Sequence, residues 1–203
     1  MKIIDCVQGS EEWFTARLGK VTGTGFAKVL AKGHGKTRKS YMIQLAAERL
    51  TGLAQESYSN AAMEWGTEHE ADARITYEIV NDVSVLLAGF VELSDEIGTS
   101  PDGLVDDEGL LEIKCPNSTT HIETIMSNKV PSQYIPQIQG GMWVAERQWC
   151  DFVSFDPRVA AVPCLCLRVA RDQKYIDNLE KEVNVFVEEL KCLTEKITGS
   201  LPF

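Results

Sequence analysis

The stretch from residue 99 to residue 116 constrains this chain more than any other, because it combines two turns with two short apolar strands. It opens with the letters Thr-Ser-Pro-Asp-Gly, and Pro and Gly so placed are typical of a tight turn. An acidic turn follows at 106–109, and Leu-Leu-Glu-Ile-Lys at 110–114 then predicts a strand that Pro116 ends. The pattern predicts a hairpin that brings Glu112 back beside Asp102.

This hairpin would gather two carboxylates and one ammonium group. Side chains alternate along a strand, so Glu112 and Lys114 share one face while Ile113 points to the other. The carboxylates of Asp102 and Glu112 suit phosphodiester hydrolysis, because Mg²⁺ is bound through one or two carboxylates plus substrate phosphate and lowers the pKa of a bound water. Lys114 could orient that water or neutralise charge on the phosphate. The alternative is a solvated hairpin with a weak ion pair between Glu112 and Lys114.

The charge of the chain is distributed unevenly. The 203 residues carry a formal net charge of −10, which by itself argues against a nucleic-acid partner. The segment from Trp13 to Ala47 contains no Asp or Glu, however, so it carries +7 and leaves −17 on the remainder. A basic segment on an acidic body is expected where a polyanion binds at one place, and a solvated basic loop is the alternative. The cations of this segment are Arg17, Lys20, Lys28, Lys32, Lys36, Arg38 and Lys39.

The length of the chain fits one domain, 1–203, with a sizeable core. No apolar run approaches the length of a membrane span, and Met1–Asp5 lacks the apolar region of a signal peptide. We therefore expect a cytoplasmic setting and no membrane partner.

Apolar periodicity and turn residues predict an α/β fold with a mixed sheet flanked by helices. An apolar strand is expected at Val83–Leu93, interrupted by Gly89, and a flexible basic loop at Lys32–Lys39. Further strands are expected at Trp149–Phe155 and Val162–Val169. The expected helices are Glu12–Leu18, Phe26–Leu30, Ser40–Thr51, Asn60–Val80, Ser118–Asn128, Ser132–Arg147 and Asp172–Ile197.

Five short motifs occur along most of the chain. They are WFTARLG at 13–19 with Thr22 and Thr24, WGTEHE at 65–70, SPDG at 100–103, EIKCP at 112–116 and QIQGGMW at 137–143. In this order the motifs resemble the lambda-exonuclease-like, or YqaJ-type, viral recombinase family of the PD-(D/E)XK nuclease superfamily. The resemblance implies a restriction-endonuclease-like core, in which a mixed central sheet is flanked by helices.

The resemblance also implies an activity and partners. It implies a Mg²⁺-dependent exonuclease that digests one strand of linear double-stranded DNA from its 5′-phosphorylated end and leaves a 3′ overhang for recombination. Two Mg²⁺ ions are implied, with Mn²⁺ as a substitute. The implied partners are DNA ends, two further copies of the chain in a homotrimer ring, and a single-strand annealing recombinase. A phage or prophage source in a bacterial host is implied as well.

Roles for single residues follow from the same resemblance. A catalytic set is implied at Asp102, Glu112, Lys114, Glu70 and Gln139, with metal ligands from Asp102, Glu112, the Ile113 carbonyl and Glu70. Contacts to DNA or its 5′-phosphate are implied for Arg17, Thr24, Thr22, Ser100 and Gln137, and the basic segment adds Lys36, Arg38 and Lys39. No role follows for His34 or His69.

Bland alternatives stand beside three of these roles. Arg17 could be a buried ion-pair partner, although its guanidinium also matches phosphate geometry. Thr22 or Thr24 could simply cap a helix, which is compatible with an anion site there. Gln139 could be a buried glutamine that bonds to backbone.

Three alternative interpretations remain open at this stage. A restriction-type endonuclease or repair nuclease would share the metal site but cut internally, and a closed circle would separate the two activities. A non-catalytic module that binds DNA ends would have a decayed site, which the complete set of Asp102, Glu112 and Lys114 argues against. An acidic globular protein without a nucleic-acid partner would leave the acid-free basic segment to chance.

Overall fold

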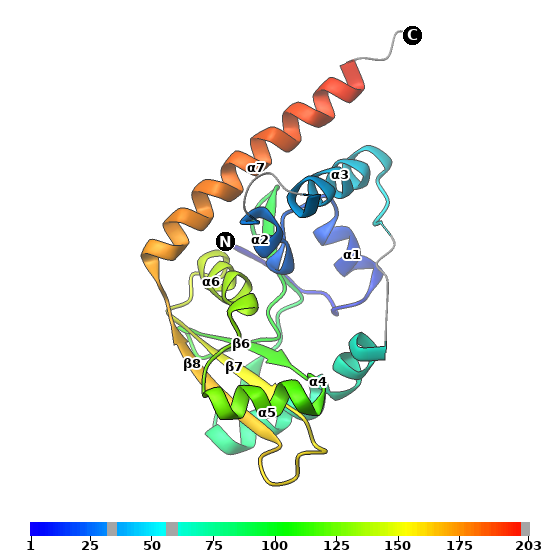
Figure 1. The fold of residues 1–203 in the computed structure, drawn as a ribbon. Helices are drawn as coiled ribbons and strands as arrows, with labels where there is room; N and C mark the ends of the chain where they lie inside the picture. The colour runs from blue at the N-terminus through cyan, green and yellow to red at the C-terminus, as the bar shows by residue number, and fades with distance from the viewer. Residues whose placement is uncertain (32–35, 56–60, 200–203) are drawn as a thin grey trace.

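The computed structural model describes residues 1–31, 36–55 and 61–199, and within them the strands form two sheets (Figure 1). An antiparallel three-stranded sheet has the order β1 (Lys2–Ile4), β3 (Phe90–Ser94), β4 (Ile97–Thr99). A mixed five-stranded sheet has the order β2 (Val85–Leu86), β5 (Gly103–Val105), β6 (Gly109–Lys114), β7 (Trp149–Phe155), β8 (Cys164–Ala170). In this sheet β6 and β7 run parallel and the other neighbours antiparallel, so the expected mixed α/β fold is confirmed.

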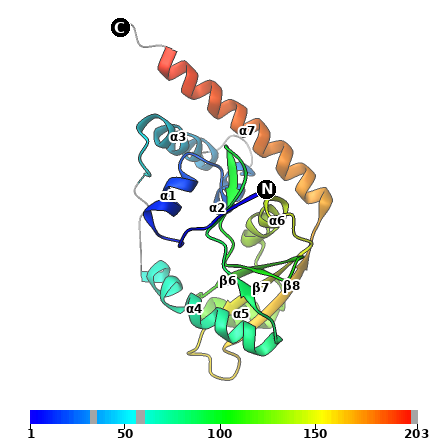
Figure 2. The ribbon, with the colours of Figure 1, turned by 180° about the vertical axis from the view of Figure 1, so that it is seen from behind.

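Helices surround the two sheets, and α7 extends along one side of the molecule beyond them (Figures 1 and 2). Helix α7 contacts α2, α3 and α6, whereas α4 contacts the strands β6, β7 and β8. None of the helices in the described part of the chain is both long and apolar enough to cross a membrane. The helices are α1 (Glu11–Arg17), α2 (Gly23–Val29), α3 (Lys36–Thr51), α4 (Ala61–Asn81), α5 (Ser118–Ser127), the 3-10 helix η2 (Ser132–Tyr134), α6 (Ile135–Val144) and α7 (Gln173–Gly199).

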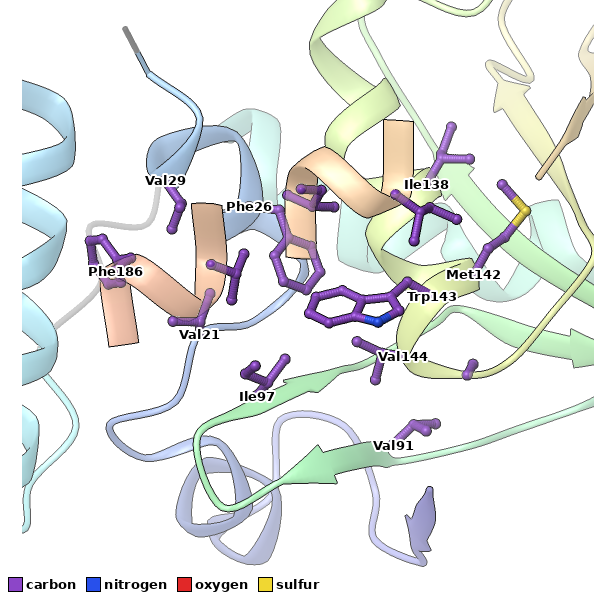
Figure 3. Close-up of a cluster of buried hydrophobic side chains, with 14 of the residues drawn as sticks. Val21, Phe26, Val29, Val91, Ile97, Ile138, Met142, Trp143, Val144 and Phe186 are labelled. Atoms are coloured by element: carbon purple, nitrogen blue, oxygen red, sulfur yellow. The ribbon is translucent and has the colours of Figure 1, made fainter. Parts of the chain in front are cut away.

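Strand β6 separates two apolar clusters because its side chains alternate. Leu110 belongs to the larger cluster with α2, α6 and α7, while Leu111 and Ile113 belong to the smaller cluster with α4. Figure 3 shows the centre of the larger cluster, where Phe26 of α2 lies beside Trp143 of α6, with ring centroids 6.0 Å apart. The two clusters clamp β6 from both faces and so fix the strand that carries Glu112.

The expected strand at Val83–Leu93 is wrong, because its two halves belong to different sheets. Strand β2 pairs with β5, whereas β3 pairs with β1 and β4. The chain crosses between the sheets around Gly89, where a Cβ atom would come within 2.1 Å of the Cys6 carbonyl oxygen. A continuous strand is impossible here, because the backbone must pass close to the N-terminal segment.

Smaller corrections concern the helices. Helix α3 begins at Lys36, so the end of the expected basic loop is helical, and residues 32–35 lie outside the described residues. The single helix expected after Pro131 is split into η2 and α6. On α4, Ala73 and Tyr77 are buried, whereas Val80 near the end of the helix is 70% exposed. The apolar spacing of residues 73, 77 and 80 alone would place all three on one buried face.

The packing of α6 against α2 predicts different effects for two adjacent glycines. A Cβ atom on Gly140 would lie 2.2 Å from the buried Phe26 ring, whereas one on Gly141 would meet Leu110 at an ordinary 3.5 Å. We expect Gly140→Ala to lower the free energy of unfolding by about 1–3 kcal/mol through overpacking. Gly141→Ala should change it by less than about 1 kcal/mol, because higher helix propensity offsets mild crowding. Urea denaturation of both variants checks this, and equal losses would contradict the packing described.

Candidate active site

The hairpin of β5 and β6 brings the predicted carboxylates together. Gly103 pairs with Leu111, which places Asp102 beside the end of β6. The backbone N–H of Ile113 donates a hydrogen bond to Asp102 Oδ2 at 2.5 Å. Glu112 is 2% exposed, and the Nζ atom of Lys114 forms an ion pair with its Oε1. The expected hairpin, with Glu112 and Lys114 on one face, is therefore confirmed.

Burial works against the negative charge of this pair. Desolvation raises the pKa of Glu112 to about 7, because burial outweighs the opposing attraction of Lys114 and the charge of Asp102 adds to the rise. Burial also raises the pKa of Asp102, although Lys114 and the Ile113 N–H oppose it. The carboxylates in turn hold the pKa of Lys114 above its ordinary value despite its own burial. Lys114 therefore stays protonated, and its single positive charge does not balance the negative charges of two carboxylates.

Glu70 of α4 adds a third carboxylate to the same region. Its pKa is raised by burial and by the charge of Asp102, while Arg74 and Lys114 act in the opposite direction. The nearest cation on its own helix is Arg74, whose Nη1 lies 3.9 Å from Glu70 Oε1. The local excess of negative charge thus extends across to α4.

The donor set fits a hard divalent cation. Among the described residues no three His, Cys, Asp or Glu side chains form a metal-holding group by themselves. Mg²⁺ does not need one, because it retains several waters and is commonly bound through one or two carboxylates and substrate oxygens. Asp102 and Glu112 supply such oxygens, and a cation beside them would offset the burial and the repulsion by Asp102 that raise the pKa of Glu112.

These groups meet at a cleft of about 800 Å³. Glu70, Asp102 and Lys114 line it, together with Thr24 from the start of α2. Ile113, whose carbonyl is an expected metal ligand, lines it as well. No role was predicted from the sequence for the other lining residues, which are Trp65, Gly66, Thr67, Cys115, Pro116, Asn117, Tyr134 and Arg158.

A second cavity, of about 340 Å³, adjoins this cleft at Thr24 and contains the predicted phosphate-binding side chains. Arg17 donates to Ser100 Oγ at 2.8 Å and to Thr22 Oγ1 at 3.3 Å, and its guanidinium lies 4.0 Å from the centre of the Trp13 ring. The indole N–H of Trp13 donates to the same Ser100 oxygen at 2.8 Å. The structure therefore brings Arg17, Thr22, Thr24 and Ser100 together at the turn that precedes Asp102.

The other predicted DNA-binding cations lie on α3. Lys36 and Lys39 are exposed there. Arg38 is buried instead, forms an ion pair with Glu189 of α7 at 2.6 Å, and lies 5.1 Å from the centre of the Phe186 ring. A role for Lys36 and Lys39 in DNA binding stays a prediction, whereas the described contacts of Arg38 join α3 to α7.

The two predicted glutamines of α6 lie in different places. Gln137 lies close to Gly23, at the start of α2, where its Cγ would be 3.5 Å from a Cβ atom on that glycine. Gln139 is buried and donates to the Ala170 carbonyl at 3.0 Å, while its own oxygen accepts from the Asp172 N–H at 2.9 Å. Both ends of its amide are bonded to backbone where β8 leads into α7, as in the alternative of a buried glutamine, and a catalytic role for Gln139 stays a prediction.

The two histidines without an expected role differ in what can be said of them. His69 stacks on Trp65 with ring centroids 3.6 Å apart, and His34 lies outside the described residues. The only signals for Trp65 and Arg158 in the sequence are the WGTEHE motif, which begins at Trp65, and the Asp-Pro turn that precedes Arg158. Their meeting depends on α4 lying beside the loop between β7 and β8.

Comparison with known proteins agrees with this geometry. A family model described as the YqaJ-like viral recombinase domain matches residues 12–148. The crystal structure of an alkaline exonuclease, LHK-Exo, from Laribacter hongkongensis shares 45% identity, covers 93% of this chain and 96% of that one, and has a TM-score of 0.88. The structure of LHK-Exo in complex with dAMP shares 46% identity over 93% and 96% of the two chains, with the same TM-score of 0.88.

A more distant structure extends the fold comparison. A phage-related exonuclease from Haemophilus somnus shares 18% identity over 88% of this chain and 96% of that one, with a TM-score of 0.67, which shows a common fold alone. No curated protein matches the chain. The family expected from the five motifs is confirmed.

The raised pKa of Glu112 predicts a pH-dependent stability of the metal-free protein. A carboxyl whose pKa is higher in the folded state stabilises the fold below its unfolded pKa, and this contribution is lost as pH rises through the folded pKa. In EDTA, the free energy of unfolding of the wild type minus that of Glu112→Gln should therefore fall by about 1–3 kcal/mol between pH 4.5 and about pH 7. Urea denaturation across this range measures the difference. As a control, Glu180→Gln on the exposed surface of α7 should show no such trend, and a pH-independent difference for Glu112→Gln would refute the prediction.

Proposed function

Because the chain belongs to the YqaJ-like viral recombinase family, we propose that it is a Mg²⁺-dependent nuclease that digests one strand of linear double-stranded DNA from its 5′-phosphorylated end. The product would be a 3′ single-stranded overhang for phage-type recombination. The similarity to the alkaline exonuclease from Laribacter hongkongensis, at 45% identity, supports the exonuclease activity.

The observation that carries this proposal is the position of Thr24, which lines both the carboxylate cleft and the Arg17 cavity. A 5′-terminal phosphate in the Arg17 cavity would place the following linkage beside Asp102 and Glu112. Arg17 suits such a phosphate because its guanidinium is held in place by Ser100 and by the Trp13 ring. The distance of the cut from the end would then be set by two adjoining sites.

The proposed mechanism assigns roles to the charged groups of the hairpin and of α4 and to the hydroxyl groups near Arg17. Asp102 and Glu112 would hold the metal, with the Ile113 carbonyl as a further ligand and Glu70 in support. When bound there, a divalent cation would supply a water of lowered pKa and polarisation of the scissile phosphate. Lys114, kept protonated by the two carboxylates, orients the attacking water and neutralises charge that develops on the phosphate. Thr22, Thr24 and Ser100 complete the binding of the terminal phosphate.

The proposed assembly and setting follow from the family alone. We propose a homotrimer with a central DNA channel and a single-strand annealing recombinase as its partner. We also propose a phage or prophage origin in a bacterial host. Lys36 and Lys39 of α3 are exposed and available for DNA backbone contacts in such an assembly.

Digestion of a linear duplex with one 5′-phosphorylated end tests the activity. We expect Mg²⁺-dependent loss of the phosphorylated strand, none in EDTA, and a covalently closed circle left intact. Asp102→Asn and Lys114→Met should each lower the rate by at least about 100-fold. The first removes a ligand of the metal, and the second removes the cation that neutralises charge on the scissile phosphate. Asp107→Asn serves as the matched control, because Asp107 is exposed in the turn of the same hairpin. This variant should cut at the wild-type rate.

Two outcomes would contradict the proposal. Cutting of the closed circle would indicate an endonuclease of the same superfamily. Retained binding to DNA ends without any Mg²⁺-dependent cutting by the wild type would indicate a module that only binds ends.

A further inference from the structure

Arg158 lies in the loop between β7 and β8, and contacts with Asp156 and Trp65 hold its side chain in place. Its Nε donates to Asp156 Oδ1 at 2.8 Å, and its Nη2 donates to Asp156 Oδ2 at 3.0 Å. Ser118 also donates to Asp156 Oδ2, at 2.7 Å, and thereby ties the carboxylate to the start of α5. The guanidinium lies 4.0 Å from the centre of the Trp65 ring, whose other neighbour is His69. Loop, α4 and α5 are thus joined at one cation.

The guanidinium of Arg158 faces outward while its partner faces inward. Asp156 is completely buried, whereas the Arg158 side chain is 47% exposed. The Asp156 carboxylate occupies one edge of the guanidinium, and none of the described residues accepts a hydrogen bond from Nη1. The arrangement therefore presents a rigid, partly used donor set on the wall of the active-site cleft.

The charges around the cleft favour an anion at this position. Lys114 and Arg158 are the two cations among the described residues that line it, and Lys114 is already engaged by Glu112. Asn117, the residue that caps the start of α5, lies in the same wall, so the positive end of the α5 dipole adds to the potential near Arg158. The remaining charged lining, Glu70 and Asp102, lies with the proposed metal site.

A second unit of the same construction lies outside the cleft and shows what a purely structural version looks like. Arg168 of β8 donates from Nε and Nη2 to buried Asp151, both at 2.8 Å, and lies 3.7 Å from the centre of the Trp149 ring. Its side chain is 59% exposed, yet it does not line the cleft. Removal of either arginine would leave a buried carboxylate without its cation, so the two losses of stability should be similar.

From this geometry we infer that Arg158 binds a backbone phosphate of the cleaved DNA strand, on the 3′ side of the scissile linkage. The inference rests on the proposed function. If the 5′-terminal phosphate occupies the Arg17 cavity at the Thr24 end of the cleft, the remaining strand leaves past the wall that contains Arg158. A fixed cation there holds the strand in register with the metal site. The cleft and the adjoining Arg17 cavity then have three phosphate positions: the terminal one in the cavity, and the scissile one and the one at Arg158 in the cleft.

The paired arginines supply the test. In release of the first nucleotide from a 5′-phosphorylated duplex, Arg158→Gln should raise KM by about 10- to 100-fold and change kcat by less than about threefold, because a charge-assisted contact to bound DNA is lost. It should also lower the slope of log affinity against log salt by about 1. Arg168→Gln should leave KM and the salt slope at the wild-type values, although it should unfold at about the same urea concentration as Arg158→Gln. Arg158→Lys should recover part of the KM.

A modified substrate tests the same contact from the side of the DNA, first in the wild type and then in the variant. A neutral methylphosphonate at the linkage that follows the scissile one on its 3′ side should raise KM by about 10- to 100-fold. In Arg158→Gln the same substitution should add less than about threefold, because the charged partner is already gone. An abasic nucleotide at that position should have little effect.

The possible failures are distinguishable. If the wild type releases no nucleotide in Mg²⁺, the proposed function fails. If the wild type is active but Arg158→Gln behaves like Arg168→Gln, Arg158 only clamps its loop and the inference is overturned. A loss with the abasic substrate in place of the methylphosphonate would also overturn it, since the group would then contact a base.

Discussion

Two carboxylates, Asp102 and Glu112, lie beside one partly buried ammonium group, that of Lys114, and the remaining structure makes this arrangement possible. Glu112 is placed on the central strand of the mixed sheet, where apolar clusters on both faces fix the backbone. Asp102 is held against the same strand by the Ile113 N–H. Burial then disfavours the charged form of Glu112 and raises its pKa to about 7, so the site would be stabilised by additional positive charge. The packing energy of the core thus supports an electrostatically unfavourable site that a divalent cation would complete.

The same turn that positions Asp102 also connects it to the basic end of the site. Ser100 accepts hydrogen bonds from both Trp13 and Arg17, two residues that belong to the N-terminal helix α1. A shift of this turn would therefore move the carboxylate and the guanidinium together. At the other end of the cleft, α4 and the loop after β7 meet through Trp65 and Arg158. The cleft is consequently built from three separate parts of the chain around one hairpin.

Sequence reasoning located the hairpin because its signals are local. Turn residues, strand alternation and the spacing of Asp102, Glu112 and Lys114 all act within a short stretch. It failed at Val83–Leu93, because Gly89 is required by the approach of Cys6, a contact remote in sequence. It left two roles open for Gln139, whose amide is bonded to backbone near the start of α7. Arg158 was overlooked because its meaning depends on Trp65, Asp156 and Ser118, which no local pattern connects.

The effect of Mg²⁺ on folding stability tests the central claim most directly, namely that the site lacks positive charge that a divalent cation supplies. Unfolding by urea would be followed in EDTA and in saturating Mg²⁺ for the wild type and for Asp102→Asn. We expect Mg²⁺ to stabilise the wild type by about 2–3 kcal/mol at a hundredfold excess over its dissociation constant. Asp102→Asn should be at least as stable as the wild type in EDTA, because it removes one of the two crowded charges, and should gain little from Mg²⁺. A variant that is destabilised in EDTA yet stabilised by Mg²⁺ as strongly as the wild type would contradict the account.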